Sequence, residues 1–526
     1  MKRTSVPPDP VYPGVALYPS PDIRVAGRKR KGIMGEYDLI IIGSGAAGFS
    51  AATQARHLGA ERVAIIERGT LWGTCVNFGC VPSKLLITVG ELLYYRNYRH
   101  PGLEVTSRFS LAATLQEKQD IIRRSLERKQ QALVGELGVD IIRGEAAFVS
   151  PDAVRAGGEE FSAPRFIIAT GSKVTIPRID GIETVDRPMT STEALEPDAV
   201  PGRLIVVGGR ALGLEFAQLY AHLGSAVTVL QRSSSLVPEE EPVLARLLAE
   251  SLAEEGLAIR TGAGIRRIAG TGGGVRVEAA IGGEETTVEA DRILFATGRS
   301  PNTRELRPEL AGVTLGKNGE VLVDRFLRTS APHIWAVGDV LGEPQLEVAA
   351  KAGGVIAAEN AIAGRGRVFD TAALPHAVFT TPQLAAVGMT EARARAAGIQ
   401  TVSRCIRMDT LVKSAIAGDT RGMVKIVAEA GTERICGVHI IAPLAADMIQ
   451  EGVLAVKHGL SVQDIISTFH VFPTMTEAIW VCARAFRHPS SGPCDAAGSP
   501  GKAPGAPGSQ APQGRTGEKL IIKPPY

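Results

Sequence analysis

The chain has 526 residues, 44% hydrophobic and 21% charged, which is typical of a soluble globular protein with several domains. Its net charge of +3 comes from interspersed charges, so we expect neither nucleic acid nor a membrane as a partner. Six cysteines are too few for a disulfide scaffold, and no apolar run reaches the roughly 18 residues of a spanning helix. We therefore expect a reducing, cytoplasmic location.

Residues 1–33 are Pro-rich and then basic, ending in the run Arg28 to Lys31, and they lack the apolar core of a secretory signal. We expect a disordered extension, with a targeting role as the alternative. Met34 lies just before the first predicted strand.

A βαβ unit of the dinucleotide-binding kind is predicted next. A buried strand over 37–42 runs into a Gly-rich turn, a helix follows over 46–58, and a second strand over 62–66 ends at Glu67. The turn lets the backbone approach a pyrophosphate at the helix N-terminus, and Glu67 would bond a ribose hydroxyl. The residues predicted to hold this dinucleotide are Gly43, Gly45, Ala46, Ala47, Gly48 and Glu67.

Two cysteines, Cys75 and Cys80, follow in the segment 73–84, Gly-Thr-Cys-Val-Asn-Phe-Gly-Cys-Val-Pro-Ser-Lys. Placed after a nucleotide cradle, such a pair can pass electrons between a cofactor and a sulfur-binding substrate. A bare Cys-x4-Cys could also be a chance pair or half of a metal site. The preceding fingerprint favours the redox interpretation.

A second βαβ unit is predicted from Arg203, after a helix over 107–137. Its strands cover 204–207 and 226–230, and its turn runs from Gly208 to Gly213 with Arg210 at the middle glycine position. Arg210 either alters the approach of the pyrophosphate or places a cation beside phosphate. The second strand ends at Gln231 and Arg232, where a carboxylate would favour NAD, so we expect NADPH rather than NADH. The alternative for Arg232 is an ordinary surface arginine.

Two strands end in matching Ala-Thr-Gly turns, which indicates an internally duplicated layout. Another strand, over 334–337, ends in an acidic residue suited to a sugar or ribityl hydroxyl. The first Ala-Thr-Gly turn supplies Ala169, Thr170 and Gly171 as candidate cofactor-binding residues, and the second supplies Gly298 with the following Arg299. The strand over 334–337 is followed by the candidates Gly338 and Asp339. After Pro375, short strands and long helices suggest an α+β domain, and 488–526 reads as a flexible tail.

In this order the motifs resemble the FAD-dependent pyridine nucleotide-disulfide oxidoreductases from about Tyr37 to Phe486. Within that family the chain looks most similar to the mercuric reductases, on the stretches 378–383, 418–422 and 442–450. The resemblance implies an α/β fold with two Rossmann-like domains and a C-terminal α+β dimerisation domain. The implied divisions are 34–185 with 301–370 for FAD, 186–300 for NAD(P), and 371–487 for dimerisation.

The resemblance also implies a homodimer in which the C-terminal domain completes the partner's active site. Dihydrolipoamide dehydrogenase and glutathione reductase place a histidine acid-base there, in a His-Pro-Thr-x-x-Glu segment. Here Phe472 replaces that histidine, while Glu477 is kept. Mercuric reductases also have Phe-Pro, but they usually follow it with tyrosine where this chain has Thr474. His470 is the alternative base, although we favour a packing or surface role for it.

The implied chemistry passes electrons from NADPH through FAD to a Cys75–Cys80 disulfide and on to a thiophilic substrate, with Hg(II) favoured. Cys80 would be the thiolate nearer the flavin, and Cys75 would be the exchanging sulfur. Gly73, Thr74 and Lys84 would lie near the flavin, with Glu215 paired to Lys84. Cys494 stands where mercuric reductases often have a Cys-Cys pair, so it is a further candidate metal ligand.

Two alternatives remain open. One is a related flavin disulfide or quinone reductase with another substrate. The other is a non-catalytic FAD-binding redox sensor or structural dimer, which Cys75, Cys80 and Lys84 argue against because a binding module needs none of them.

Overall fold

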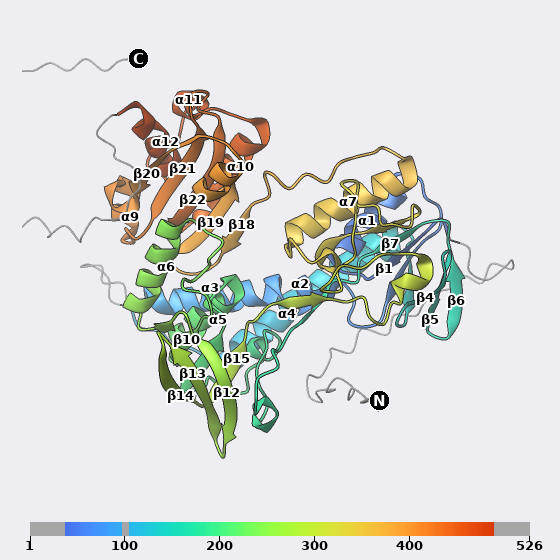
Figure 1. Cartoon of the computed structure of the whole chain (residues 1–526), viewed down its shortest axis with the longest axis horizontal. Helices are drawn as coiled ribbons and strands as arrows, with labels where there is room; N and C mark the ends of the chain where they lie inside the picture. The colour runs from blue at the N-terminus through green and yellow to red at the C-terminus, as the bar shows by residue number, and fades with distance from the viewer. Residues whose placement is uncertain (1–36, 97–104, 489–526) are drawn as a thin grey trace, which may run out of the picture. The chain divides into compact units, whose positions relative to one another are not determined.

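The computed structural model describes residues 37–96 and 105–488 (Figure 1). The expected N-terminal extension, most of the expected tail and Cys494 lie outside these residues. Two parallel sheets and a C-terminal antiparallel sheet confirm the expected fold class.

The first parallel sheet has five strands in the order β17-β7-β1-β2-β3. Its strands are β1 (Leu39–Ile42), β2 (Val63–Glu67), β3 (Asp140–Arg143), β7 (Phe166–Ile168) and β17 (Ile334–Ala336). Helices α1 (Ala46–His57) and α7 (Glu347–Ala363) pack together closely, since a Cβ added at Gly354 would lie 2.3 Å from the Ala47 carbonyl oxygen. An antiparallel sheet accompanies this unit: β4 (Ala147–Ser150), β5 (Ala153–Ala156) and β6 (Glu159–Ser162).

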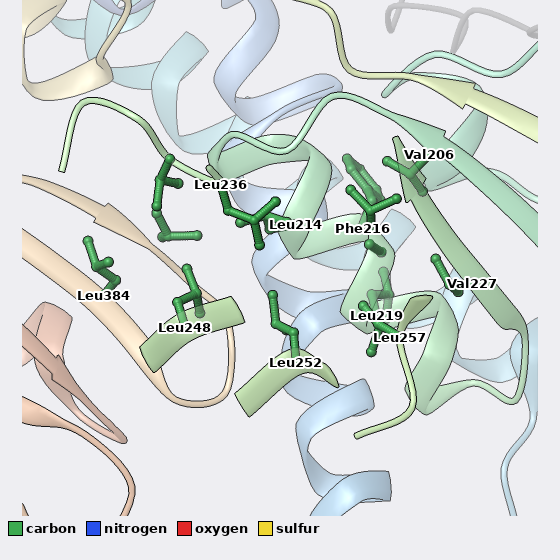
Figure 2. Close-up of a cluster of buried hydrophobic side chains, with 14 of the residues drawn as sticks. Val206, Leu214, Phe216, Leu219, Val227, Leu236, Leu248, Leu252, Leu257 and Leu384 are labelled. Carbon is green, nitrogen blue, oxygen red and sulfur yellow. The ribbon is translucent and has the colours of Figure 1, made fainter. Parts of the chain in front are cut away.

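The second parallel sheet repeats the plan with four strands in the order β11-β10-β9-β15. They are β9 (Arg203–Val207), β10 (Ala226–Leu230), β11 (Ala258–Arg260) and β15 (Arg292–Phe295). Its helices are α5 (Ala211–His222) and α6 (Pro242–Glu254), and its antiparallel sheet is β12 (Gly264–Thr271), β13 (Gly274–Ile281) and β14 (Glu284–Ala290). Figure 2 shows the core of this unit, where Leu214 and Phe216 of α5 lie in one buried cluster with Leu384 of the C-terminal sheet.

Three helices lie between β2 and β3 in sequence. They are α2 (Gly73–Asn77), α3 (Cys80–Tyr95) and α4 (Leu111–Gln130), the last continuing as a π-helical turn over Gln131–Glu136. The expected helix over 107–137 begins later because the Ser110 side chain caps it by accepting from the Ala113 N–H. The stretch Gly73–Tyr95 is long and apolar enough to span a membrane by composition. It is divided here, because α2 ends at Asn77 and α3 begins at Cys80, and Leu86 of α3 packs in the core cluster around α5.

The C-terminal domain is an antiparallel sheet in the order β18-β19-β22-β21-β20. Its strands are β18 (His376–Val378), β19 (Gln383–Gly388), β20 (Thr401–Arg407), β21 (Met423–Glu429) and β22 (Ile435–Ala442). Its helices are α8 (Glu391–Ala396), α9 (Val412–Ala417), α10 (Ala445–His458), α11 (Val462–Ser467) and α12 (Glu477–Arg484). Buried faces of β21, β22, α10 and α12 form its core.

Candidate active site

The two nucleotide-binding turns are built alike. Gly43 and Gly208 begin them with positive φ angles of +108° and +119°. A Cβ at Gly43 would lie 2.2 Å from the carbonyl oxygen of Ala169, and one at Gly208 would lie 2.3 Å from that of Ala296. Both positions therefore require glycine, and each Ala-Thr-Gly segment packs directly on the Gly-rich turn of its own unit.

The last glycine of each fingerprint brings the helix against its turn. A Cβ at Gly48 would lie 1.9 Å from the Gly43 oxygen, and one at Gly213 would lie 2.0 Å from the Gly208 oxygen. This close approach presents the N-termini of α1 and α5 to a cavity of about 1190 Å³. Helix N-termini bind phosphate through free N–H groups. Both turns therefore suit a dinucleotide pyrophosphate.

Glu67, at the end of β2, braces the first turn. One of its carboxylate oxygens accepts from the Ser44 N–H (2.9 Å) and from the Ser44 hydroxyl (2.7 Å). The other accepts from the Gly69 N–H (2.8 Å). The Trp72 N–H in turn donates to the Ser44 hydroxyl oxygen (2.8 Å), so this network also fixes the start of the cysteine segment. Glu67 was predicted from the sequence as a site residue, whereas Ser44 was not.

The cysteines lie on either side of the break between α2 and α3. Gly73 has a φ of +68°, and a Cβ there would lie 2.6 Å from the Gly45 Cα, so the cysteine segment packs directly on the first fingerprint. A Cβ at Gly79 would lie 3.1 Å from the Cys75 Cα, which leaves little room for a side chain. Both cysteines line the cavity as free thiols.

The two thiols differ in acidity. The hydrogen bond between them lowers the pKa of Cys80 to about 7, and Lys84 acts in the same direction against the effect of burial. The same hydrogen bond, together with burial, raises the pKa of Cys75 well above its usual value. Cys80, at the first position of α3, is therefore the more readily ionised of the two thiols.

Glu215 joins three parts of the chain. One of its oxygens lies 2.5 Å from the Lys84 Nζ on α3, and the other accepts from the Phe379 N–H (2.9 Å). The Lys84 ammonium also lies 4.4 Å from the centre of the Phe379 ring. The family stretch 378–383 contains Phe379, but its contact with Lys84 was not predicted from the sequence.

Asp339 follows β17 and is held at the edge of the first unit. Its Oδ2 accepts from the Ser172 hydroxyl (2.6 Å) and lies 3.9 Å from the Arg299 Nε. Arg299 also donates to the Ser172 hydroxyl and carbonyl oxygens (2.7 and 2.8 Å). These contacts join the two Ala-Thr-Gly turns through the short antiparallel pair β8 (Ser172–Val174) and β16 (Arg299–Pro301). Asp339 lines the cavity, as a ribityl-binding residue must.

The side chains of Gln231 and Arg232, at the end of β10, differ in burial and in their contacts. The Gln231 side chain is buried and accepts from the Gly209 N–H (2.9 Å), so it braces the second turn as Glu67 braces the first. Arg232 is exposed and lines the cavity. Arg232 is thus the cationic member of the pair at the cavity.

The candidate residues of the segment 469–477 do not line this cavity. His470 contacts the Glu451 carboxylate through Nε2 (2.9 Å), whereas Phe472 is 64% exposed. Glu477 begins α12, and its N–H approaches the Thr474 hydroxyl (3.4 Å). Apolar Phe469 and Val471 are also strongly exposed here, as expected for a surface that a partner covers.

The structure thus brings most of the predicted residues to one cavity. Those that line it are Gly43, Gly45, Ala46, Ala47, Glu67, Gly73, Thr74, Cys75, Cys80, Lys84, Ala169, Thr170, Gly171, Gly208, Gln231, Arg232, Gly298, Arg299, Gly338 and Asp339. Gly48, Gly213 and Glu215 support it from behind. Glu347 also lines it and forms an ion pair with Lys351 (2.6 Å); no sequence motif had marked this carboxylate.

Comparison with known proteins decides the family. The model for "Pyridine nucleotide-disulphide oxidoreductase" matches residues 37–354, and the dimerisation domain of the same family matches residues 374–483. The chain belongs to the pyridine nucleotide-disulphide oxidoreductases. It is an NAD(P)H-dependent flavoprotein oxidoreductase, as the sequence analysis expected, and its dimerisation domain supports a homodimer.

Individual oxidoreductases of this family are similar over most of the chain. Mercuric reductase of Lysinibacillus sphaericus is 40% identical over 453 residues, covering 86% of this chain and 82% of that protein. Dihydrolipoamide dehydrogenase of Chaetomium thermophilum is 36% identical, covering 88% and 94% respectively. The Cu(II) complex of the HOCl-induced flavoprotein disulfide reductase RclA from Escherichia coli has a TM-score of 0.78 and 29% identity, covering 86% of this chain and 100% of that one.

The cavity of this oxidoreductase fits the FAD on which its family depends. The glycine-only contact of Gly43 with Ala169 leaves the α1 N-terminus open for a pyrophosphate, and the Glu67 and Asp339 carboxylates suit sugar and ribityl hydroxyls. The second turn offers the equivalent place for a pyridine nucleotide.

Proposed function

We propose that this flavoprotein uses NADPH to reduce Hg(II) to Hg(0) at Cys75 and Cys80. The observation that carries the proposal is Phe472, an exposed aromatic ring where related disulfide reductases have an imidazole. Releasing a thiol from an organic disulfide requires a proton, which a phenyl ring cannot supply. A metal cation passed between thiolates has less need for that proton.

The cysteine pair supplies the ligand chemistry. Thiolates are soft ligands and favour soft metal ions. Cys80, whose pKa is about 7, is the readily ionised member, and Cys75 is the exchanging one. Bound FAD would carry the electron pair from the nicotinamide to this site. The reaction balances as NADPH plus Hg(II) giving NADP⁺, a proton and Hg(0).

The remaining parts of the proposal concern cofactor, assembly and location. Arg232 favours NADPH through its charge at the end of β10. Burial of Phe469, Val471 and Phe472 in a homodimer would bring the C-terminal segment to the partner's cysteines. The expected division into FAD, NAD(P) and dimerisation domains and the expected cytoplasmic location belong to the same proposal.

A disulfide or quinone reductase is the second candidate. The similarity to dihydrolipoamide dehydrogenase and to the disulfide reductase RclA favours it. His470 would be its acid-base group. The contact of His470 with Glu451 supports a packing role for this histidine instead.

The deciding experiment measures NADPH consumption by the FAD-loaded enzyme. Hg(II) with excess thiol is compared with glutathione disulfide, lipoamide and a quinone, and volatile Hg(0) is collected. Hg(II)-dependent turnover with release of Hg(0) supports the proposal. Efficient turnover with one of the organic substrates and none with Hg(II) overturns it.

A further inference from the structure

The second nucleotide turn differs from the first at one position. The middle position of the first turn is Gly45. A Cβ added there would lie 4.0 Å from the Gly73 Cα, so the cysteine segment covers that glycine. The matching residue in the second turn is Arg210, which caps α5 with an extended backbone (φ −101°, ψ −179°). Its side chain is 63% exposed and lines the cavity. A cation therefore stands where the first turn has bare backbone.

Glu239 faces this arginine from the loop after β10. Arg210 Nη1 lies 3.7 Å from Glu239 Oε1, which is longer than a hydrogen bond, so the two form a loose ion pair. The other oxygen, Oε2, is buried and has no hydrogen-bond partner among the described residues. A buried acceptor without a partner is unfavourable. With a separation of 3.7 Å and an exposed arginine, the pair holds Arg210 weakly.

The backbone on both sides of Glu239 is anchored. The Val237 N–H donates to the carbonyl oxygen of Gly209, next to Arg210 (2.9 Å). The buried Glu240 carboxylate lies 2.5 Å from His376 Nε2 at the C-terminal sheet. These contacts hold the segment that carries Glu239 next to the second turn.

We propose that Glu239 competes with the pyridine nucleotide for Arg210. Before the nucleotide binds, Arg210 pairs loosely with Glu239; the pyrophosphate at the α5 N-terminus then takes the guanidinium. Arginine recognises phosphate with charge-assisted bidentate bonds, which are stronger than a loose carboxylate pair. Glu239 thus lowers nucleotide affinity and favours release of the oxidised nucleotide. The inference rests on the family's pyridine-nucleotide chemistry, and it does not depend on which substrate accepts the electrons.

Three variants separate this competition from other roles. Arg210→Ala should weaken NADP⁺ and NAD⁺ equally, by about tenfold, because the pyrophosphate is common to both. Glu239→Gln should tighten both by about two- to fivefold, the range of a partly exposed ion pair. In the double variant, the gain from Glu239→Gln should disappear, because the arginine for which Glu239 competes is gone.

The test is calorimetric titration of the oxidised, FAD-loaded enzyme with NADP⁺ and with NAD⁺, so that binding is read without turnover. Arg246→Ala and Glu250→Gln, at exposed positions of α6 that do not line the cavity, are matched charge controls. Arg210→Lys keeps the charge without the bidentate geometry and should lose less affinity than Arg210→Ala. Flavin content checks that each variant is folded.

Three results would overturn the proposal. A loss confined to NADP⁺ in Arg210→Ala would assign this arginine to the 2′-phosphate. Weaker or unchanged binding in Glu239→Gln would mean that the carboxylate binds the nucleotide itself or is not a competitor. Tighter binding that persists in the double variant would show a general charge effect instead of competition for Arg210.

Discussion

Lys84 and Glu215 form an ion pair of 2.5 Å between α3, which carries Cys80, and α5, which begins at the second nucleotide turn. Glu215 is only 4% exposed. Because its other oxygen accepts from Phe379, the carboxylate ties the cysteine helix, the second nucleotide unit and the C-terminal domain together. The charge beside Cys80 is therefore set by packing between distant parts of the chain.

Cys75→Ala should abolish two-electron turnover and leave FAD bound, because the cradle from Gly43 to Gly48 is unchanged. Flavin content and NADPH oxidation measure the two effects. Cys436→Ala, at a buried cysteine of β22, is the control and should retain activity. Full activity in Cys75→Ala would remove the cysteine pair from the mechanism.

The charge-transfer absorbance of the reduced enzyme should depend on pH through Cys80. Its pKa is about 7, so the thiolate band should appear as the pH rises through about 7 and fade below it. Lys84→Gln should move the midpoint upward, by on the order of one unit, because the lysine charge lowers this pKa. Glu347→Gln should move it downward, since that carboxylate raises the pKa. Shifts of the same sign in both variants would contradict this electrostatic account.

Wild-type enzyme should prefer NADPH to NADH by roughly tenfold, because a charge-assisted bond to the 2′-phosphate contributes on the order of 1.5–3 kcal/mol. Arg232→Gln should remove the preference. Gln231→Glu keeps the acceptor for the Gly209 N–H and adds a negative charge, so it should favour NADH. The ratio of kcat/KM for the two cofactors measures each effect, and a wild-type preference for NADH would show that Arg232 does not bind the nucleotide.

Phe472→His should raise disulfide reduction, with Glu477 available to orient the new imidazole, because a positioned acid-base group contributes roughly 10²–10⁴-fold. Thr474→Tyr, which restores the mercuric-reductase pattern, should preserve or improve Hg(II) turnover. Each variant is assayed with Hg(II) and with glutathione disulfide beside the wild type. If the wild type reduces disulfides efficiently and His470→Ala abolishes that activity, His470 is the base and Hg(II) is not the favoured substrate.

Gly73→Ala should cost FAD and stability, on the order of 1–3 kcal/mol, because its φ of +68° and its 2.6 Å approach to the Gly45 Cα both exclude a side chain. Gly69→Ala is the matched control, since a Cβ there would meet only the Glu67 side chain at an ordinary 3.6 Å. Thermal unfolding and flavin content distinguish the two. Equal stability of both variants would mean that the cysteine segment is free to move away from the fingerprint.

The sequence by itself determined the local pattern of the two nucleotide units. The strand ending at Glu67, the glycine spacing and the two Ala-Thr-Gly turns are local features, and the conformations they require follow from backbone sterics. The predicted strand over 226–230 matches β10. The pairing of Lys84 with Glu215 was expected from the family resemblance, not from spacing.

Only the tertiary structure decided which polar side chains are available for chemistry. Gln231 and Arg232 are neighbours in sequence and both line the cavity, yet Gln231 is buried with its side-chain oxygen on the Gly209 N–H, whereas Arg232 is exposed. Phe379 meets Lys84 where the C-terminal domain approaches α3, and Glu239 meets Arg210 where the loop after β10 folds back on the second turn. Such contacts join residues far apart in the chain, and their energies depend on burial and geometry. Residue spacing carries neither of these quantities.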